Sequence, residues 1–261
     1  MLGKLFERLG NSPSTAVPVS LGESRTRAIT ESRGRRLVEG YWGRYVAFLH
    51  DAAASTTRVL RDPSGGLPCL TIRFGGVRLY FAAMSDLAAL GLGPFDVNWG
   101  YLTAWLCVMR AQTHATGLRE VSQVLSGECV ELHDDVATST FYWDPLRIAS
   151  SNIIHDPEAG ARALRDRIVD CVRAWAECYS GITLSLSGGL DSSIVYAALR
   201  DSPAQEKLTC FHYYLTGADM DERRFARQVA QSGGSQLIER VRDSTVRLEP
   251  LLQIEASPEP T

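Results

Sequence analysis

The residues best suited to chemistry lie together in one stretch, SGGLDSS, at positions 187–193. An apolar, β-type run (182–186) precedes the stretch and a helical run (191–200) follows it. Open α/β sheets bind ligands at such strand-to-helix junctions. Glycines let backbone N–H groups approach a phosphate, serine hydroxyls add donors, and a helix start favours an anion. The stretch therefore predicts a phosphate-binding loop.

Asp191 places a carboxylate inside this predicted anion site. A cation between the carboxylate and the phosphate would remove the repulsion, and Mg²⁺ commonly combines one or two carboxylates with substrate phosphates. We therefore expect ATP with Mg²⁺. The chain contains no GxxxxGK[ST] phosphate loop and no GxSxG nucleophile turn. The alternative reading is a helix cap after a glycine turn, which needs only one of these polar residues.

Strand and helix patterns alternate around the loop. Asp156-Pro157-Glu158 has the cap, proline and acid of a helix start. The patterns predict a helix over 157–178, a strand over 182–186, a helix over 191–200, a strand over 207–215 and a helix over 222–232. This order predicts a parallel sheet. On the first helix, Leu164, Cys171 and Cys178 share an apolar face, which predicts core packing.

The chain before this region reads differently. Residues 1–36 are rich in Ser, Arg and Gly and are expected to be weakly ordered, residues 37–150 form a β-rich domain, and residues 151–261 form the α/β domain. The run Tyr45–His50 is apolar on both faces, which predicts a central strand. The runs 69–74 and 77–82 flank Gly75-Gly76, which predicts a hairpin. A helix over 97–112 and strands over 126–132 and 139–145 complete this domain.

Composition narrows the function class. A net charge of −3 gives no electrostatic reason to expect nucleic acid or an acidic membrane as partner. Six cysteines without a CxxC pair predict reduced thiols in a cytoplasmic protein, and the scattered histidines argue against structural zinc. No apolar run is long enough to cross a membrane. We expect a soluble cytoplasmic protein.

The loop resembles the pyrophosphate-binding loop of the asparagine synthetase-like enzymes, within the N-type ATP pyrophosphatases. The likeness covers roughly residues 38 to 245, through YWGRYVAF, RDPSGGLP, FYWDP and MDERRFARQVAQSGG. It implies a degenerate Ntn-amidotransferase-like β-rich domain followed by a truncated parallel-sheet α/β ATP-pyrophosphatase domain. Asp221 and Glu222 match the family's DE segment, but an ordinary helix start would explain these two residues equally well.

The resemblance implies activation of a carboxylate as its acyl-adenylate, followed by attack of an amine. It implies catalytic roles for Ser187 and Asp191, with Asp191 as the metal contact. Adenine would lie against the ends of the two strands, and His212 reads as a strand residue rather than a proton carrier. The implied nucleotide contacts are Leu186, Ser187, Gly188, Gly189, Leu190, Asp191, Ser192, Ser193 and Tyr213.

The branch of the family is indicated by what the first domain lacks. No cysteine precedes Cys69, so the amino-terminal nucleophile of a glutaminase is absent. The chain looks most like the bacterial lasso-peptide macrolactam synthetases, whose substrate is a precursor peptide, with asparagine synthetase and β-lactam synthetase as alternatives. The family's later Lys-containing segment is not in this sequence, which holds only Lys4 and Lys207. Two alternatives therefore remain open. A partner protein of the same pathway could supply this segment, or the chain could be a nucleotide-binding subunit that does not catalyse the reaction.

A sulfurtransferase that modifies tRNA is the remaining alternative, since other ATP pyrophosphatases share this type of loop. The acidic balance, the absence of a CxxC pair and the likeness over the first domain all stand against it.

Overall fold

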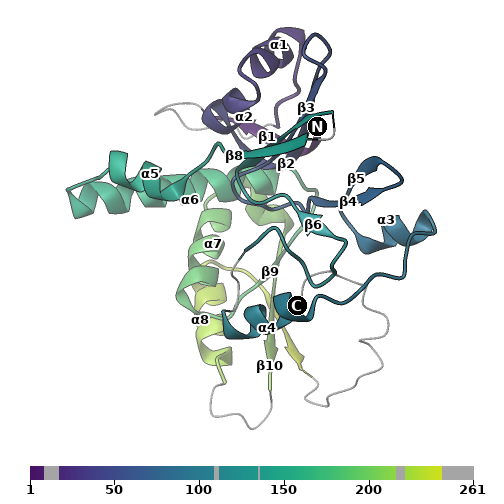
Figure 1. The fold of residues 1–261 in the computed structure, drawn as a ribbon. Coiled ribbons are helices and arrows are strands. Elements are labelled where there is room, and N and C mark those ends of the chain that lie inside the picture. Colours follow the sequence, from purple (N-terminus) through teal and green to yellow (C-terminus); the bar gives the residue numbers. More distant parts are fainter. Residues whose placement is uncertain (9–17, 109–111, 135, 216–220, 243–261) are drawn as a thin grey trace. The chain divides into compact units, whose positions relative to one another are not determined.

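The structure is a computed structural model that describes residues 1–8, 18–108, 112–134, 136–215 and 221–242. These residues form two compact units (Figure 1). The first contains residues 1–8 and 19–151, and the second contains the segment that begins at Asn152. The boundary predicted from the sequence lies between residues 150 and 151.

The larger sheet of the first unit has five antiparallel strands. In spatial order they are β1 (Leu2–Glu7), β2 (Tyr41–Asp51), β3 (Thr56–Arg61), β7 (Glu128–His133) and β8 (Val136–Phe141). The run Tyr45–His50 lies inside β2, which pairs with β1 on one side and β3 on the other. Tyr45 and Ala47 join one hydrophobic cluster and Val46 joins another. The predicted central strand is confirmed.

The smaller sheet has the order β5-β4-β6, from β4 (Leu70–Phe74), β5 (Val77–Phe81) and β6 (Ser122–Gln123). Phe74 pairs with Val77, so Gly75 and Gly76 form a two-residue connection. Their φ angles of +56° and +79° are those of a mirror-image hairpin turn, which requires positive φ at both positions. The predicted hairpin is confirmed.

The first unit is layered. Its helices are α1 (Glu23–Glu31), α2 (Arg35–Gly40), α3 (Met84–Ala89), α4 (Trp99–Cys107) and α5 (Pro145–Ser151). One hydrophobic cluster joins α1 and α2 to the larger sheet, a second lies between the two sheets, and a third joins the smaller sheet to α3. The clusters therefore define four layers: helices, sheet, sheet, helix.

The amino-terminal segment is more ordered than expected. Residues 2–7 pair with β2 along their whole length, and Leu5 and Phe6 are buried. Ile29 of α1 is buried too. Weak order over residues 1–36 is therefore wrong for β1 and α1, because a few apolar side chains suffice when a larger sheet offers an edge. Residues 9–17 lie outside the described residues.

The second unit follows the predicted alternation. Its elements are α6 (Pro157–Glu177), β9 (Ile182–Ser185), α7 (Leu190–Arg200), a 3₁₀ turn (Pro203–Lys207), β10 (Leu208–Tyr214), α8 (Arg223–Ser232) and β11 (Leu237–Val241). The strands form a parallel sheet of order β11-β10-β9. The Asp156 side chain caps α6 by accepting from the Glu158 N–H at 3.0 Å. The mixed α/β fold is confirmed, and β11 was not predicted.

Helices α7 and α8 pack on the parallel sheet (Figure 1). Tyr196 of α7 is fully buried, and its hydroxyl donates to the Ala230 carbonyl of α8 at 3.1 Å. Leu186, Cys210 and Ala230 complete this cluster. The bond between Tyr196 and Ala230 ties together the two helices that frame the end of β9.

The predicted apolar face of α6 is largely exposed. Leu164 and Cys171 are exposed and Cys178 is half-buried. The expected core packing of this face is wrong for the first two, because α6 contacts α7 and the 3₁₀ turn mainly through residues of its last turns, Val172 and Ala176. None of the six cysteines forms a disulfide bond. Within the described residues, no helix combines the length and apolar character needed to cross a membrane.

Candidate functional site

The predicted loop lies where β9 leaves the parallel sheet. The Leu186 N–H still donates to the Phe211 carbonyl of β10 at 2.8 Å, and the chain then turns into α7. Gly189 is the N-cap residue of that helix, with an extended backbone. The structure thus brings residues 187–193 together at the carboxyl end of a parallel strand, which is where α/β sheets bind ligands.

The serine hydroxyls bond to the loop itself. Ser187 Oγ accepts from the Gly189 N–H at 3.1 Å and lies 3.0 Å from Ser192 Oγ. Ser192 Oγ also accepts from the Ser187 N–H at 3.3 Å, and Ser193 Oγ donates to the Gly189 carbonyl at 2.7 Å. The serines therefore fix the loop's shape.

The backbone amides at the helix start are open. The N–H groups of Gly188, Leu190 and Asp191 have no acceptor among the described residues. The first amides of any helix lack an internal partner, and the helix dipole adds partial positive charge at the same place. Together these groups form a site for an anion such as a phosphate.

Gly188 lets the loop lie against α8. Its φ is +82°, and a Cβ at this position would lie 2.5 Å from the Ala226 nitrogen and 2.6 Å from the Phe225 Cβ. Real Cβ atoms do not make contacts this short. Glycine is thus required here both by the backbone angle and by the helix behind it.

Asp191 is the residue of the loop suited to a metal. Its side chain is exposed on the first turn of α7, and it has no hydrogen-bond or ion-pair partner among the described residues. Those residues also contain no group of three His, Cys, Asp or Glu side chains that could enclose a metal. A single free carboxylate beside open amides fits Mg²⁺, which takes few protein ligands and binds substrate phosphates.

Leu186 and Tyr213 differ in what they can offer a nucleotide. The Leu186 side chain is fully buried in the core, so a contact from this residue would come from its backbone. Tyr213 lies at the end of the neighbouring strand with its side chain 57% exposed, and its ring meets Phe211 edge-on at 5.2 Å. Tyr213 can therefore offer an exposed aromatic surface on β10, the strand that pairs with β9.

Two arginines of α8 were not anticipated from the sequence. Arg223 binds both carboxylate oxygens of Asp221 and lies over the Tyr214 ring, 3.9 Å from its centre. Hydrogen bonds from Arg223 lower the pKa of Asp221 to about 2. Asp221 also accepts from the Arg223 backbone N–H at 3.0 Å, and it lies one residue before Glu222, the N-cap of α8, which agrees with a position next to a helix start. The second arginine is Arg227, four residues after Arg223. This i, i+4 spacing places both on one face of the helix and could have been recognised in the sequence.

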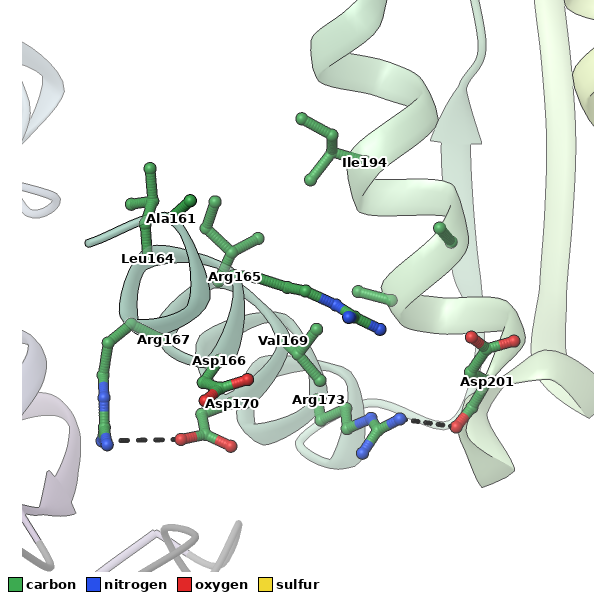
Figure 2. Close-up of a pocket in the computed structure, with 13 residues that line it drawn as sticks. Ala161, Leu164, Arg165, Asp166, Arg167, Val169, Asp170, Arg173, Ile194 and Asp201 are labelled. Carbon is green, nitrogen blue, oxygen red and sulfur yellow. Dashed lines mark hydrogen bonds and ion pairs between the residues drawn. The ribbon is translucent and has the colours of Figure 1, made fainter. Parts of the chain in front are cut away.

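A cavity of about 830 Å³ lies elsewhere in the second unit, between α6 and α7 (Figure 2). Leu164, Ile168 and Ile194 line it, and Arg165 reaches from α6 toward α7. None of residues 186–193 lines this cavity. It holds side chains of both charges and is separate from the open amides, so the loop remains the candidate site.

Lys207 has a structural position. Its ammonium group donates to the Ala176 carbonyl at 2.9 Å and to the Tyr179 carbonyl at 2.5 Å. Ala176 lies in the last turn of α6 and Tyr179 follows the C-cap residue, so the ammonium group also meets the negative end of the helix dipole. Lys207 therefore caps α6 and is not a free base.

Comparison with known proteins identifies the same segment. Residues 163–248, which are 86 of the 261 residues, match the asparagine synthase family model. This segment contains the loop, α7, β10, α8 and β11. No curated protein matches the chain.

Among solved structures, the chain is similar to a glutamine-dependent NAD⁺ synthetase from Acinetobacter baumannii in complex with ADP. The identity is 13% and the TM-score is 0.31, over 81% of this chain and 53% of the other. The chain thus spans about half the length of that protein.

Proposed function

We propose that this chain is an ATP-dependent synthetase of the asparagine synthetase-like family, which activates a carboxylate as acyl-AMP for attack by an amine. The observation that carries the proposal is the loop at residues 187–193. It presents open amides at the end of a parallel strand, within the segment that matches the asparagine synthase family.

In this reaction a substrate carboxylate oxygen attacks the α-phosphorus of ATP, and the bond to the β-phosphate oxygen breaks. Pyrophosphate leaves, and an amine nitrogen then attacks the acyl carbon, loses a proton and releases AMP. The amides of Gly188, Leu190 and Asp191 would bind the β- and γ-phosphates and stabilise the charge that grows on pyrophosphate. Tyr213 would contact the adenosine end of the nucleotide.

Asp191 would hold Mg²⁺, which neutralises phosphate charge when bound. The free carboxylate and the absence of a basic residue from the loop support this role. Ser187 and Ser192 would keep the loop in its binding shape through their mutual contact.

The finer proposal is lasso-peptide macrolactam formation, which joins an Asp or Glu side chain of a precursor peptide to the peptide's N-terminal amine. It rests on the resemblance over the first unit, whose two stacked sheets between helices support a degenerate Ntn-amidotransferase-like domain. Cys69 is buried, and burial raises the pKa of its thiol to about 11, which argues against a glutaminase nucleophile. Asparagine synthetase and β-lactam synthetase chemistry are the alternatives.

A second candidate is a nucleotide-binding subunit that supports a catalytic partner protein. The position of Lys207 favours it, because this is the lysine of the second unit and it is bound to two carbonyls. For either function we expect a cytoplasmic protein that has neither nucleic acid nor a membrane as its partner, and the net charge of −3 supports the expectation about partners.

The test is ATP–pyrophosphate exchange by the purified chain with Mg²⁺ and a peptide carboxylate. Exchange by the wild type, lost in Asp191→Ala and kept in the control Asp166→Asn, would support a synthetase. Mg²⁺-dependent ATP binding without exchange would support the nucleotide-binding subunit. Absence of both would refute the nucleotide site.

A further inference from the structure

A buried histidine contacts the residue from which the loop starts. His212 of β10 is 6% exposed, and its Nδ1 lies 2.9 Å from the Leu186 carbonyl oxygen. A carbonyl oxygen can only accept a hydrogen bond, so Nδ1 must carry the proton. This contact joins a side chain of one strand to the last backbone carbonyl before the loop on its neighbour.

The bond completes the attachment of Leu186 to β10. The Leu186 N–H donates to the Phe211 carbonyl at 2.8 Å, and the Leu186 carbonyl accepts from the His212 side chain. Backbone pairing between β9 and β10 ends at Ser185 and Phe211. The imidazole therefore adds a hydrogen bond between β10 and the first peptide group after the paired residues of β9.

The next residue, Ser187, organises the loop. Its hydroxyl accepts from the Gly189 N–H, and its own N–H donates to Ser192. A shift of the peptide between Leu186 and Ser187 would move these groups together. The direction in which the open amides point thus depends on a peptide whose carbonyl is held by His212.

We infer that His212 is a positioning residue for the nucleotide loop, acting through the Leu186 carbonyl without contacting the nucleotide. The inference rests on the proposed function in so far as it names ATP as the ligand that the loop binds. Glu239 pairs with His212 in register on β11, and Arg227 binds both of its carboxylate oxygens.

The test compares two substitutions whose side chains have the same branched shape and the same number of heavy atoms. His212→Asn keeps a donor where Nδ1 stands, and His212→Leu removes the donor and leaves the Leu186 carbonyl without a partner. Titration calorimetry with MgATP is expected to give a Kd about tenfold higher for His212→Leu and within about threefold of wild type for His212→Asn. Rescue by asparagine separates positioning from simple filling of the core.

Nuclear magnetic resonance supplies a readout that does not need ATP. Long-range ¹H–¹⁵N correlations should show Nδ1 of His212 protonated. The backbone amide signals of Ser187 and Gly188 should move in His212→Leu and stay near wild type in His212→Asn. An unprotonated Nδ1, or equal shifts in both variants, would overturn the inference.

The two proposals fail in different ways. A wild-type chain that does not bind MgATP would refute the nucleotide site, while the amide signals would still decide whether His212 positions the loop. A wild-type chain that binds MgATP, with an unchanged Kd in His212→Leu, would refute the positioning role and leave the proposed function intact.

Discussion

Replacing Gly188 by alanine tests whether the loop depends on the helix behind it. The residue has a φ of +82°, and its Cβ would meet the backbone of α8 at Phe225 and Ala226. Gly189 is the matched control, because its φ is −72° and its Cβ would meet no atom closer than Ser187 Oγ at 3.3 Å. Both changes add one methyl group to the same loop.

The magnitude follows from two costs. A left-handed backbone costs an alanine about 1–2 kcal/mol, and forcing a methyl group into packed surroundings costs about 1–3 kcal/mol. The smaller entropy of the unfolded alanine chain returns about 0.4–1 kcal/mol. We expect Gly188→Ala to destabilise the second unit by about 2–4 kcal/mol and Gly189→Ala to change it by less than about 1 kcal/mol.

Hydrogen exchange followed by mass spectrometry is the suitable assay, because peptides covering β9, α7 and β10 report the second unit alone. Faster exchange of β9 and β10 is expected in Gly188→Ala, together with loss of MgATP binding. Equal exchange in both variants would refute the reasoning, since it would mean that the loop can leave α8 without cost.

Three further predictions concern single side chains. The pKa of Asp221 is about 2 in the folded chain against a usual 3.8, so its pairing with Arg223 stabilises the fold above about pH 4 and this stabilisation is lost as the pH falls toward 2. The free energy of unfolding of Asp221→Asn should therefore depend less on pH in this range than that of the wild type. Exposed Cys171 should react with a thiol reagent at pH 8 in the native chain, whereas Cys69, whose pKa burial raises to about 11, should react only after unfolding. Lys207→Met should destabilise the end of α6 by about 1 kcal/mol, measured by hydrogen exchange in that helix.

The sequence was most informative where a pattern has one structural solution. Gly75-Gly76 between two apolar runs requires a hairpin with positive φ at both residues, and the structure has it. The alternation from α6 to α8 likewise leaves a parallel sheet as the way to bury short apolar strands. The loop at residues 187–193 belongs to this class, because its position between strand and helix follows from the same alternation.

Elements that depend on distant partners were missed. β1 is ordered because β2 offers it an edge, and nothing in MLGKLFERLG reveals that partner. Cys171 was predicted to be buried and is exposed. An apolar stripe shows which face of a helix can pack, but it does not show how much of that face a neighbouring element covers. The contact of His212 with Leu186 could not be predicted for a similar reason, because it exists only once two strands lie in register.

The charges of the second unit determine how the loop can bind a phosphate. Arg223 and Arg227 of α8 are bound to Asp221 and Glu239, and the loop itself has no basic residue. At the loop itself, positive charge for a triphosphate would then come from the helix start and from a cation at Asp191. ATP binding should therefore be weak in EDTA and strengthen with Mg²⁺ in the wild type, and Asp191→Ala should lose this dependence in calorimetry. Equal affinity for ATP with and without Mg²⁺ would show that a cation at Asp191 is not what offsets the phosphate charge.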